Sequence, residues 1–247
     1  MGPIICLIFG LVIGSFLNVC IYRIPRNISI VKPFSFCPDC KNSIKPWHNI
    51  PVLSYIILKG KCAYCGNKIS IRYPIVEFLN GFLYGIAYLN FGLNFILPFI
   101  FLFISALIVI SFIDLEFQII PDVISIPLII TGLIISLLPH GFDGLVSNIK
   151  ESLLGILIGG GSLYIVALLS KGGMGGGDIK LNAGVGAILG WQNALLTVFI
   201  GSLTGSIVGI IILKKTGNRK IPFGPFLSIG ALVSLFFGRE ILQFYLG

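Results

Sequence analysis

The sequence predicts an all-α membrane protein, a polytopic bundle of about eight transmembrane helices. Its mean hydropathy is +1.02, and only 11% of its 247 residues are charged. Such a chain has too little polar surface to cover a water-soluble globule of this size, so lipid must solvate much of it. Long apolar runs, interrupted by one sizeable polar stretch, indicate where the helices lie.

A helix needs around 20 apolar residues to cross the hydrocarbon core. The runs of suitable length are 3–22, 73–91, 95–113, 121–138, 150–170, 181–213 and 222–245. The run 181–213 is too long for one untilted span, and we expect 190–193 to divide it into a short and a full helix. The first run lacks the basic n-region and cleavage site of a signal peptide, so we expect a retained anchor.

The distribution of basic residues predicts the orientation of these spans. If 23–72 is cytoplasmic, eight spans leave Lys150 and Arg239 as the only basic residues on the other side. A seven-span arrangement would move the basic cluster between Lys214 and Lys220 outside, against the positive-inside rule. We therefore expect three parts, with both termini facing away from the cytoplasm: a first transmembrane helix (1–22), a cytoplasmic loop domain (23–72) and a transmembrane catalytic domain (73–247).

The polar stretch 23–72 contains two Cys-x-x-Cys pairs, Cys37 with Cys40 and Cys62 with Cys65. Each pair can direct two thiolates at one ion, so together they predict a tetrahedral zinc site. The alternative is two disulfides, which a reducing cytoplasm disfavours. A closed site of four thiolates has no position for a reacting water, so the zinc would be structural. Gly66 suits the tight turn after the second pair.

Two aspartates at the ends of apolar runs are candidate catalytic residues. Asp114 closes the third span and Asp178 opens the sixth, which places both at the cytoplasmic boundary. Either one alone could be a helix-end residue bonded to backbone. Close together, they would share one proton, and the ionised member could deprotonate a water while the other polarised a carbonyl. Helix dipoles favour the anion on Asp178 and the proton on Asp114.

The chain resembles the prepilin peptidases, or type IV leader peptidases, bacterial membrane aspartic proteases of the GxGD group. The resemblance rests on the N-terminal segment Gly10–Pro25, the two cysteine pairs, Arg72–Glu77, Asp114–Asp122, and Gly175–Leu181 with its Gly-x-Gly-Asp motif. It covers nearly the whole chain and assigns catalysis to Asp114 and Asp178.

The resemblance also implies the reaction. Members of this family cleave the short basic leader of type IV prepilins or pseudopilins on the cytoplasmic side of the bacterial inner (plasma) membrane. Many then methylate the new N-terminus with S-adenosylmethionine, and the cysteine loop accompanies this bifunctional form. The sequence carries no glycine-rich nucleotide fingerprint of its own, so methyl transfer follows from the resemblance alone.

A basic leader would be repelled by a basic cytoplasmic face unless nearby acids offset the charge. We expect at least one of Glu77, Glu116 and Asp122 to contact the leader, and we include Lys180 as a tentative substrate-binding residue. Asp122 could equally follow Pro121 simply to cap the fourth span. Glu116 could equally be solvated at the interface.

Two other classes of function remain open at this point. A proton- or cation-coupled transporter would place its acids near the midplane of broken helices. A non-enzymatic assembly factor would use the zinc loop for docking and tolerate loss of both aspartates. The net charge of +8 is explained by topology, so we expect no nucleic-acid partner. Substrate identity and oligomeric state do not follow from the sequence.

Overall fold

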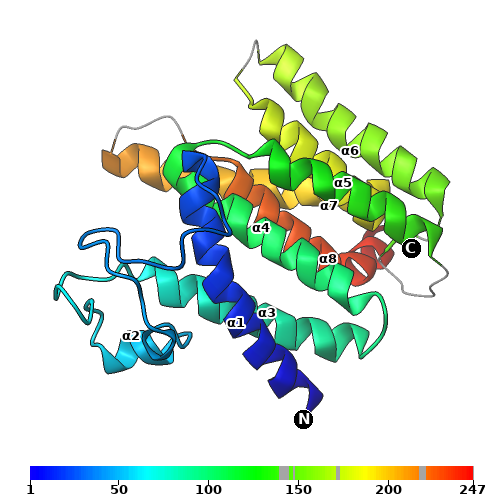
Figure 1. The fold of residues 1–247 in the computed structure, drawn as a ribbon. Helices are drawn as coiled ribbons and strands as arrows, with labels where there is room; N and C mark the ends of the chain where they lie inside the picture. Colours follow the sequence, from blue (N-terminus) through cyan, green and yellow to red (C-terminus); the bar gives the residue numbers. More distant parts are fainter. Residues whose placement is uncertain (139–144, 147, 171–172, 217–220, 247) are drawn as a thin grey trace. The chain divides into compact units, whose positions relative to one another are not determined.

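The computed structural model describes residues 1–138, 145–146, 148–170, 173–216 and 221–246, and it is helical (Figure 1). The elements are α1 (Gly2–Arg23), η1 (Ile24–Arg26), η2 (Pro46–His48), α2 (Leu53–Ile57), α3 (Arg72–Phe91), α4 (Leu97–Phe117), α5 (Asp122–Leu137), α6 (Ile149–Leu169), α7 (Gly176–Thr216) and α8 (Gly224–Leu246). Within the described residues there is no β-strand, only two isolated antiparallel bridges. The predicted fold class is confirmed.

Among the described residues, five helices are long and apolar enough to cross a bilayer: α1, α4, α6, α7 and α8. The apolar helix α5 is shorter. The protein is therefore a multi-pass membrane protein, while the count of eight crossings stays a prediction. Gly190 has φ 83° inside α7, which divides this helix at the position that the sequence indicated. Because glycine adopts positive φ readily, it tolerates this interruption.

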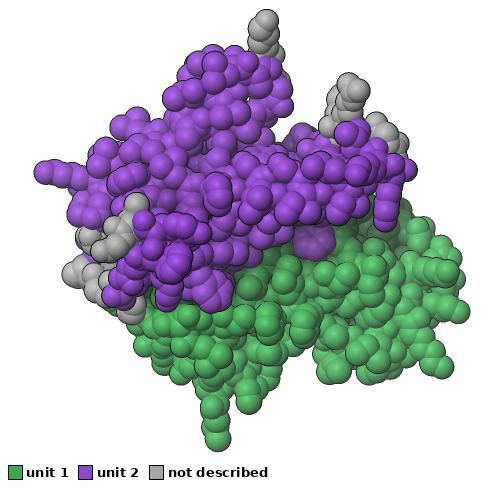
Figure 2. All heavy atoms as spheres, turned by 180° about the vertical axis from the view of Figure 1, so that it is seen from behind, with its two compact units in different colours: residues 1–109 green, residues 110–247 purple. Residues whose placement is uncertain are grey.

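The chain divides into two compact units, Met1–Val109 and Ile110–Gly247, which Figure 2 colours separately. In the first unit, α1 packs against α3. A methyl group on Gly10 would lie 2.8 Å from the Cα of Gly81, and one on Gly14 would lie 2.7 Å from the Cα of Glu77. Glycine thus allows the two helix backbones to approach closely, as in other membrane helix pairs.

A buried hydrogen-bond network connects three helices of the first unit. Asn80 of α3 donates to the carbonyl of Gly10 in α1 over 2.7 Å and accepts from Ser105 of α4 over 3.1 Å. The hydroxyl groups of Tyr84 and Ser105 lie 2.8 Å apart. Polar side chains in an apolar interior are costly unless paired, so this network favours one arrangement of α1, α3 and the first half of α4.

In the second unit, α7 packs against α5, α6 and α8. Gly155 of α6 and Gly186 of α7 meet backbone to backbone, leaving no room for a Cβ on either. Gly132 of α5 contacts Ala187, where a methyl group would come within 2.5 Å of the backbone. The first part of α7, before Gly190, is therefore held at fixed depth between α5 and α6. This is the part that begins with Asp178.

Candidate active site and metal centre

Asp114 lies in the last turn of α4, and its side chain is 5% exposed. The helix ends shortly after it because Gln118 has φ 55°, a left-handed conformation, and the Gln118 N–H donates to the Asp114 carbonyl over 2.9 Å. We expected the span to end at residue 113, whereas α4 continues to Phe117. Asp114 is thus held inside a helical turn.

The carboxylate of Asp114 has a partner that the sequence did not reveal. The backbone N–H of Gly224, the first residue of α8, donates to Asp114 Oδ2 over 2.8 Å. The first N–H groups of a helix have no partner within the helix, so Asp114 caps α8 from a distant part of the chain. Oδ2 thus accepts this hydrogen bond. The other oxygen, Oδ1, is left to carry a proton or to contact a substrate.

Asp178 lies in the first turn of α7, directly after Gly177. The Gly175 N–H bonds to its carboxylate, and the Asp178 N–H donates to the Gly175 carbonyl over 3.2 Å. We expected Asp178 to open this helix, but α7 begins at Gly176. The side chain therefore turns back toward the glycines that precede it.

Ile120, in the connection between α4 and α5, lies next to two glycines, one beside each aspartate. A methyl group on Gly177 would lie 2.7 Å from Ile120 Cβ, and one on Gly224 would lie 3.2 Å from Ile120 Cδ1. The same methyl on Gly224 would lie 2.8 Å from Asp114 Oδ2. Asp114 and Asp178 are also close enough to interact electrostatically. The fold thus brings together two carboxylates that are far apart in the sequence.

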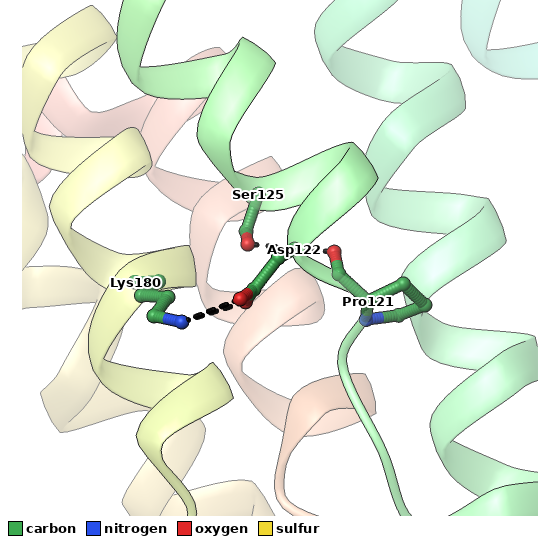
Figure 3. Close-up of polar contacts among 4 residues, drawn as sticks. All are labelled: Pro121, Asp122, Ser125 and Lys180. Carbon is green, nitrogen blue, oxygen red and sulfur yellow. Dashed lines mark hydrogen bonds and ion pairs between the residues drawn. The ribbon is translucent and has the colours of Figure 1, made fainter.

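Asp122 and Lys180 form an ion pair beside this site (Figure 3). The Lys180 ammonium lies 2.7 Å from both carboxylate oxygens of Asp122, with side chains 44% and 55% exposed respectively. Asp122 is the first residue of α5, but Pro121 is the N-cap and no side chain caps this helix. The pair links the start of α5 to the start of α7. Exposed pairs of this kind contribute about 0–1 kcal/mol.

The two other acids belong to different compact units. Glu116 is exposed and lies in the last turn of α4. Glu77 belongs to the first unit and is 8% exposed, and its Oε2 accepts the backbone N–H of Val52 over 2.8 Å. The Ser15 hydroxyl also bonds to Glu77. Glu77 is therefore engaged with the cysteine-containing loop and α1.

The four loop cysteines converge. Their Sγ atoms all lie within 4.8 Å of one another, and those of Cys37 and Cys65 are 4.0 Å apart. Four thiolates around zinc at about 2.3 Å form a tetrahedron with edges of about 3.8 Å, so the cluster could hold a metal of this size. All six cysteines of the chain are free in the structure, and the four loop thiols converge on one point rather than forming two bonded pairs.

The two Cys-x-x-Cys turns have matching backbones. Cys37 N–H donates to Asn42, and Cys62 N–H donates to Asn67, each closing a small loop. The residue after each second cysteine has positive φ, as predicted for Gly66 (73°); in the first turn that residue is Lys41 (60°). Backbone N–H groups of Cys65 and Tyr64 lower the pKa of the Cys62 thiol to about 7. This favours the thiolate at Cys62, whereas burial and hydrogen bonds from the other thiols raise the pKa of the Cys37 and Cys65 thiols.

Buried Arg23 holds the loop before the first cysteine pair. Its guanidinium donates to the carbonyls of Ser29 and Pro33, each over 2.8 Å, and lies 5.6 Å from the ring centre of Phe36. Arg23 is the last residue of α1. The loop is thus fastened to the membrane helices at two points, by Arg23 and by Glu77.

The chain is similar to known proteins over nearly its full length. Residues 8–91 match the profile described as "Bacterial Peptidase A24 N-terminal domain", and residues 101–210 match that of the "Type IV leader peptidase family". A protein named "Prepilin leader peptidase/N-methyltransferase" from Neisseria gonorrhoeae is 36% identical, over 92% of this chain and 87% of the relative. The proteins of that name from Pseudomonas aeruginosa (36%, 97% and 92%) and Bacillus subtilis (35%, 98% and 97%) are similar to the same degree. No solved structure matches significantly.

Proposed function

Since this chain belongs to the type IV leader peptidase family, we propose that Asp114 and Asp178 are the catalytic pair with which it removes the leader peptide of prepilins or pseudopilins. One observation carries the proposal: α4, α7 and α8 bring the two carboxylates to one place, through Gly224 and Ile120. The relatives are named as N-methyltransferases as well as leader peptidases, and we propose that this enzyme methylates the new N-terminus. The transporter and the assembly-factor alternatives are not favoured.

The chemistry requires one carboxylate in each protonation state. The ionised carboxylate takes a proton from water, and the water oxygen forms a bond to the scissile carbonyl carbon. The protonated carboxyl donates to the carbonyl oxygen, and the C–N bond then breaks as the amine nitrogen takes up a proton. We propose that one of the two carboxyls holds the proton, but helix dipoles no longer single out Asp114: the Gly224 N–H at the start of α8 favours the anion on Asp114, as the start of α7 does on Asp178. When Asp114 is the proton holder, Oδ1 carries the proton, because Oδ2 accepts the Gly224 N–H.

We propose that Cys37, Cys40, Cys62 and Cys65 hold a structural zinc ion. The support is the donor set, four soft thiolates at tetrahedral spacing without a fifth ligand in the cluster. Such an ion would join the two Cys-x-x-Cys turns and stabilise the loop. S-adenosylmethionine is the expected methyl donor, and we assign no residue to it.

The leader's basic residues need an acidic partner, and we propose that they compete with Lys180 for Asp122. The existing pair is exposed, so exchanging one ammonium for another costs little. Glu116 would add to the local negative charge. Glu77 is already committed to Val52, so we expect the smallest effect on leader affinity from its replacement. Amide substitutions at all three acids that leave KM and its salt dependence unchanged would refute this idea.

The distribution of basic residues supports a proposal for the orientation of the protein in the membrane. With eight spans, most basic residues fall on the side that carries the cysteine loop, and the positive-inside rule then supports a cytoplasmic position for that side in a bacterial inner membrane. The substrate's apolar helix would then lie in the same bilayer. Its scissile bond would arrive at the interface by lateral diffusion.

The decisive experiment uses purified enzyme in lipid nanodiscs with a prepilin-like peptide, with and without S-adenosylmethionine. Mass spectrometry reports leader loss and methyl addition separately. We expect leader loss without the methyl donor, and both changes with it. Leader loss by the Asp114→Asn or the Asp178→Asn variant at the wild-type rate would contradict the catalytic assignment.

A further inference from the structure

Five exposed apolar side chains of the cysteine loop lie on α2 or just before it, while other exposed apolar residues, such as Val31 and Phe34, lie elsewhere in the loop. We define the α2 face as Trp47, Ile50, Leu53, Ile56 and Ile57. Ile57 is 74% exposed and Trp47 60%. Leu53, Ile56 and Ile57 share one side of α2 because residues three and four apart on a helix are neighbours. Ser54, at the edge of this face, is buried.

The α2 face is one connected piece of structure. The Ser54 hydroxyl donates to the Trp47 carbonyl over 3.0 Å and accepts the Ile50 N–H over 2.9 Å. The turn η2, which carries Trp47, is thereby fixed to α2. A rigid apolar surface of this kind is unusual on a protein surface in contact with water.

The depth of α2 indicates what covers this face. Glu77, which binds the Val52 N–H at the start of α2, lies five residues after the start of α3. It also bonds to Ser15, eight residues before the end of the spanning helix α1. At 1.5 Å per residue, these positions lie about 7 Å and about 12 Å inside the respective helix ends. The start of α2 therefore lies beside the last turns of α1, a helix long and apolar enough to span a membrane, and beside the first turns of α3, rather than beyond the ends of these helices.

The charge of the loop complements a lipid surface. Asp39 is its only acidic residue, against nine basic residues: Arg23, Arg26, Lys32, Lys41, Lys45, Lys59, Lys61, Lys68 and Arg72. Lys59 lies two residues after the end of α2, and the Lys45 ammonium lies 5.4 Å from the ring centre of Trp47. Apolar side chains with tryptophan and flanking lysines are typical of segments that lie in the boundary between headgroups and acyl chains.

We propose that α2 is a membrane-interface helix whose face, from Trp47 to Ile57, inserts into the boundary layer of the surrounding bilayer. The bilayer is then a third attachment of the loop, besides Arg23 and Glu77. It would hold the cysteine cluster at a fixed height above the lipid. The proposal concerns the lipid contact of the loop and does not depend on the peptidase reaction.

Depth-dependent fluorescence quenching tests this proposal on the full-length protein in nanodiscs. The chain has two tryptophans, so Trp191→Phe leaves Trp47 as the single probe. In a variant in which both native tryptophans are replaced, Ile57→Trp places a single probe at the most exposed position of the α2 face. Phe34→Trp is the matched control: it is 84% exposed, and its carbonyl lies at Arg23, at the end of α1. Unchanged metal content shows that the loop of each variant is folded.

An interfacial helix buries its apolar face by about 5–10 Å, so we expect the ratio of quenching by brominated lipid to quenching by aqueous iodide to be roughly twofold or more higher for Ile57→Trp than for Phe34→Trp. Trp47 should behave as the Ile57→Trp probe does. Equal ratios, with full access for iodide, would show that the face lies in water. Protection of the Ile57→Trp probe from both quenchers would show that protein covers it. Either result overturns the proposal.

Discussion

The cysteine cluster and the aspartate site are built in opposite ways. The cysteine cluster is local: each Cys-x-x-Cys turn closes through hydrogen bonds of its own backbone, such as Cys62 to Asn67. The aspartate site is assembled by helix packing, and Asp114 finds its partner Gly224 110 residues away. A local site depends on a few residues in sequence, whereas an assembled site depends on every contact that sets helix depth. Changes should therefore damage one site without the other.

The largest expected effect comes from the carboxylates. We expect Asp114→Asn and Asp178→Asn each to lower the rate of leader cleavage by about 10³-fold or more, since positioned acids and bases contribute about 10²–10⁴-fold. Single-turnover mass spectrometry with the prepilin-like peptide measures this loss. Metal content should stay at the wild-type level in both variants. Loss of metal together with activity would mean that the two sites are not independent.

A change at Gly224 should weaken the assembled site without removing a carboxylate. A methyl group there would lie 2.8 Å from Asp114 Oδ2 and 3.2 Å from Ile120 Cδ1. We expect Gly224→Ala to lower cleavage by about 10–100-fold, because a misplacement of roughly 1 Å can cost about 10²-fold. Gly161→Ala is the control, because nothing lies within 4 Å of the added methyl group. Wild-type activity of Gly224→Ala would show that the position of Asp114 tolerates displacement.

The packing of α6 on α7 provides a test through stability. A Cβ on Gly155 would collide with the backbone of Gly186, which cannot move aside as a side chain can. We expect Gly155→Ala to lower the free energy of unfolding by about 1–3 kcal/mol, the usual cost of overpacking. Denaturation in mixed micelles, with Gly161→Ala as control, measures it. Equal stability of the two variants would contradict the close contact.

Metal removal should affect the local site only. We expect Cys65→Ser, or treatment with a chelator, to release the metal and to make the loop between Arg23 and Arg72 sensitive to protease. Leader cleavage should fall by less than about tenfold, because a closed thiolate site has no position for catalytic water. Metal analysis, limited proteolysis and the cleavage assay are the measurements. A loss as large as that of Asp114→Asn would make the metal part of catalysis.

The smallest expected effect is that of the exposed ion pair. Asp122→Asn and Lys180→Ala should each change the free energy of unfolding by less than about 1 kcal/mol. If the leader competes for Asp122, the first change should raise KM and the second should lower it, with kcat nearly constant. Parallel changes of KM in both variants would argue against that competition.

The same difference explains what the sequence could predict. The helix positions agree within a few residues because apolar runs of span length have few alternatives in lipid, and glycine marks the break at Gly190. The cysteine cluster could be predicted because its ligands come in two short motifs. The roles of Gly224 and Ile120 could not be predicted from the sequence, because neither side chain carries a functional group. Their importance comes from what lies next to them after the helices pack.

Glu77 shows that the partner of an acidic side chain cannot be predicted from its position in the sequence alone. Its position near a predicted boundary suggested contact with a basic leader, and that role stays a prediction. In the structure its carboxylate binds the Val52 N–H, a backbone group that any residue supplies. Likewise, α2 was not predicted, because five residues are too few for a periodic pattern.

The proposed catalytic chemistry requires Asp114 and Asp178 to act as one unit, and a double-mutant cycle tests this most directly. Single-turnover cleavage would be measured for Asp114→Asn, Asp178→Asn and the variant with both changes. Residues that act together are strongly non-additive. We predict that the double variant is no slower than the slower single variant. Losses that multiply, or a single variant that keeps substantial activity, would contradict the account.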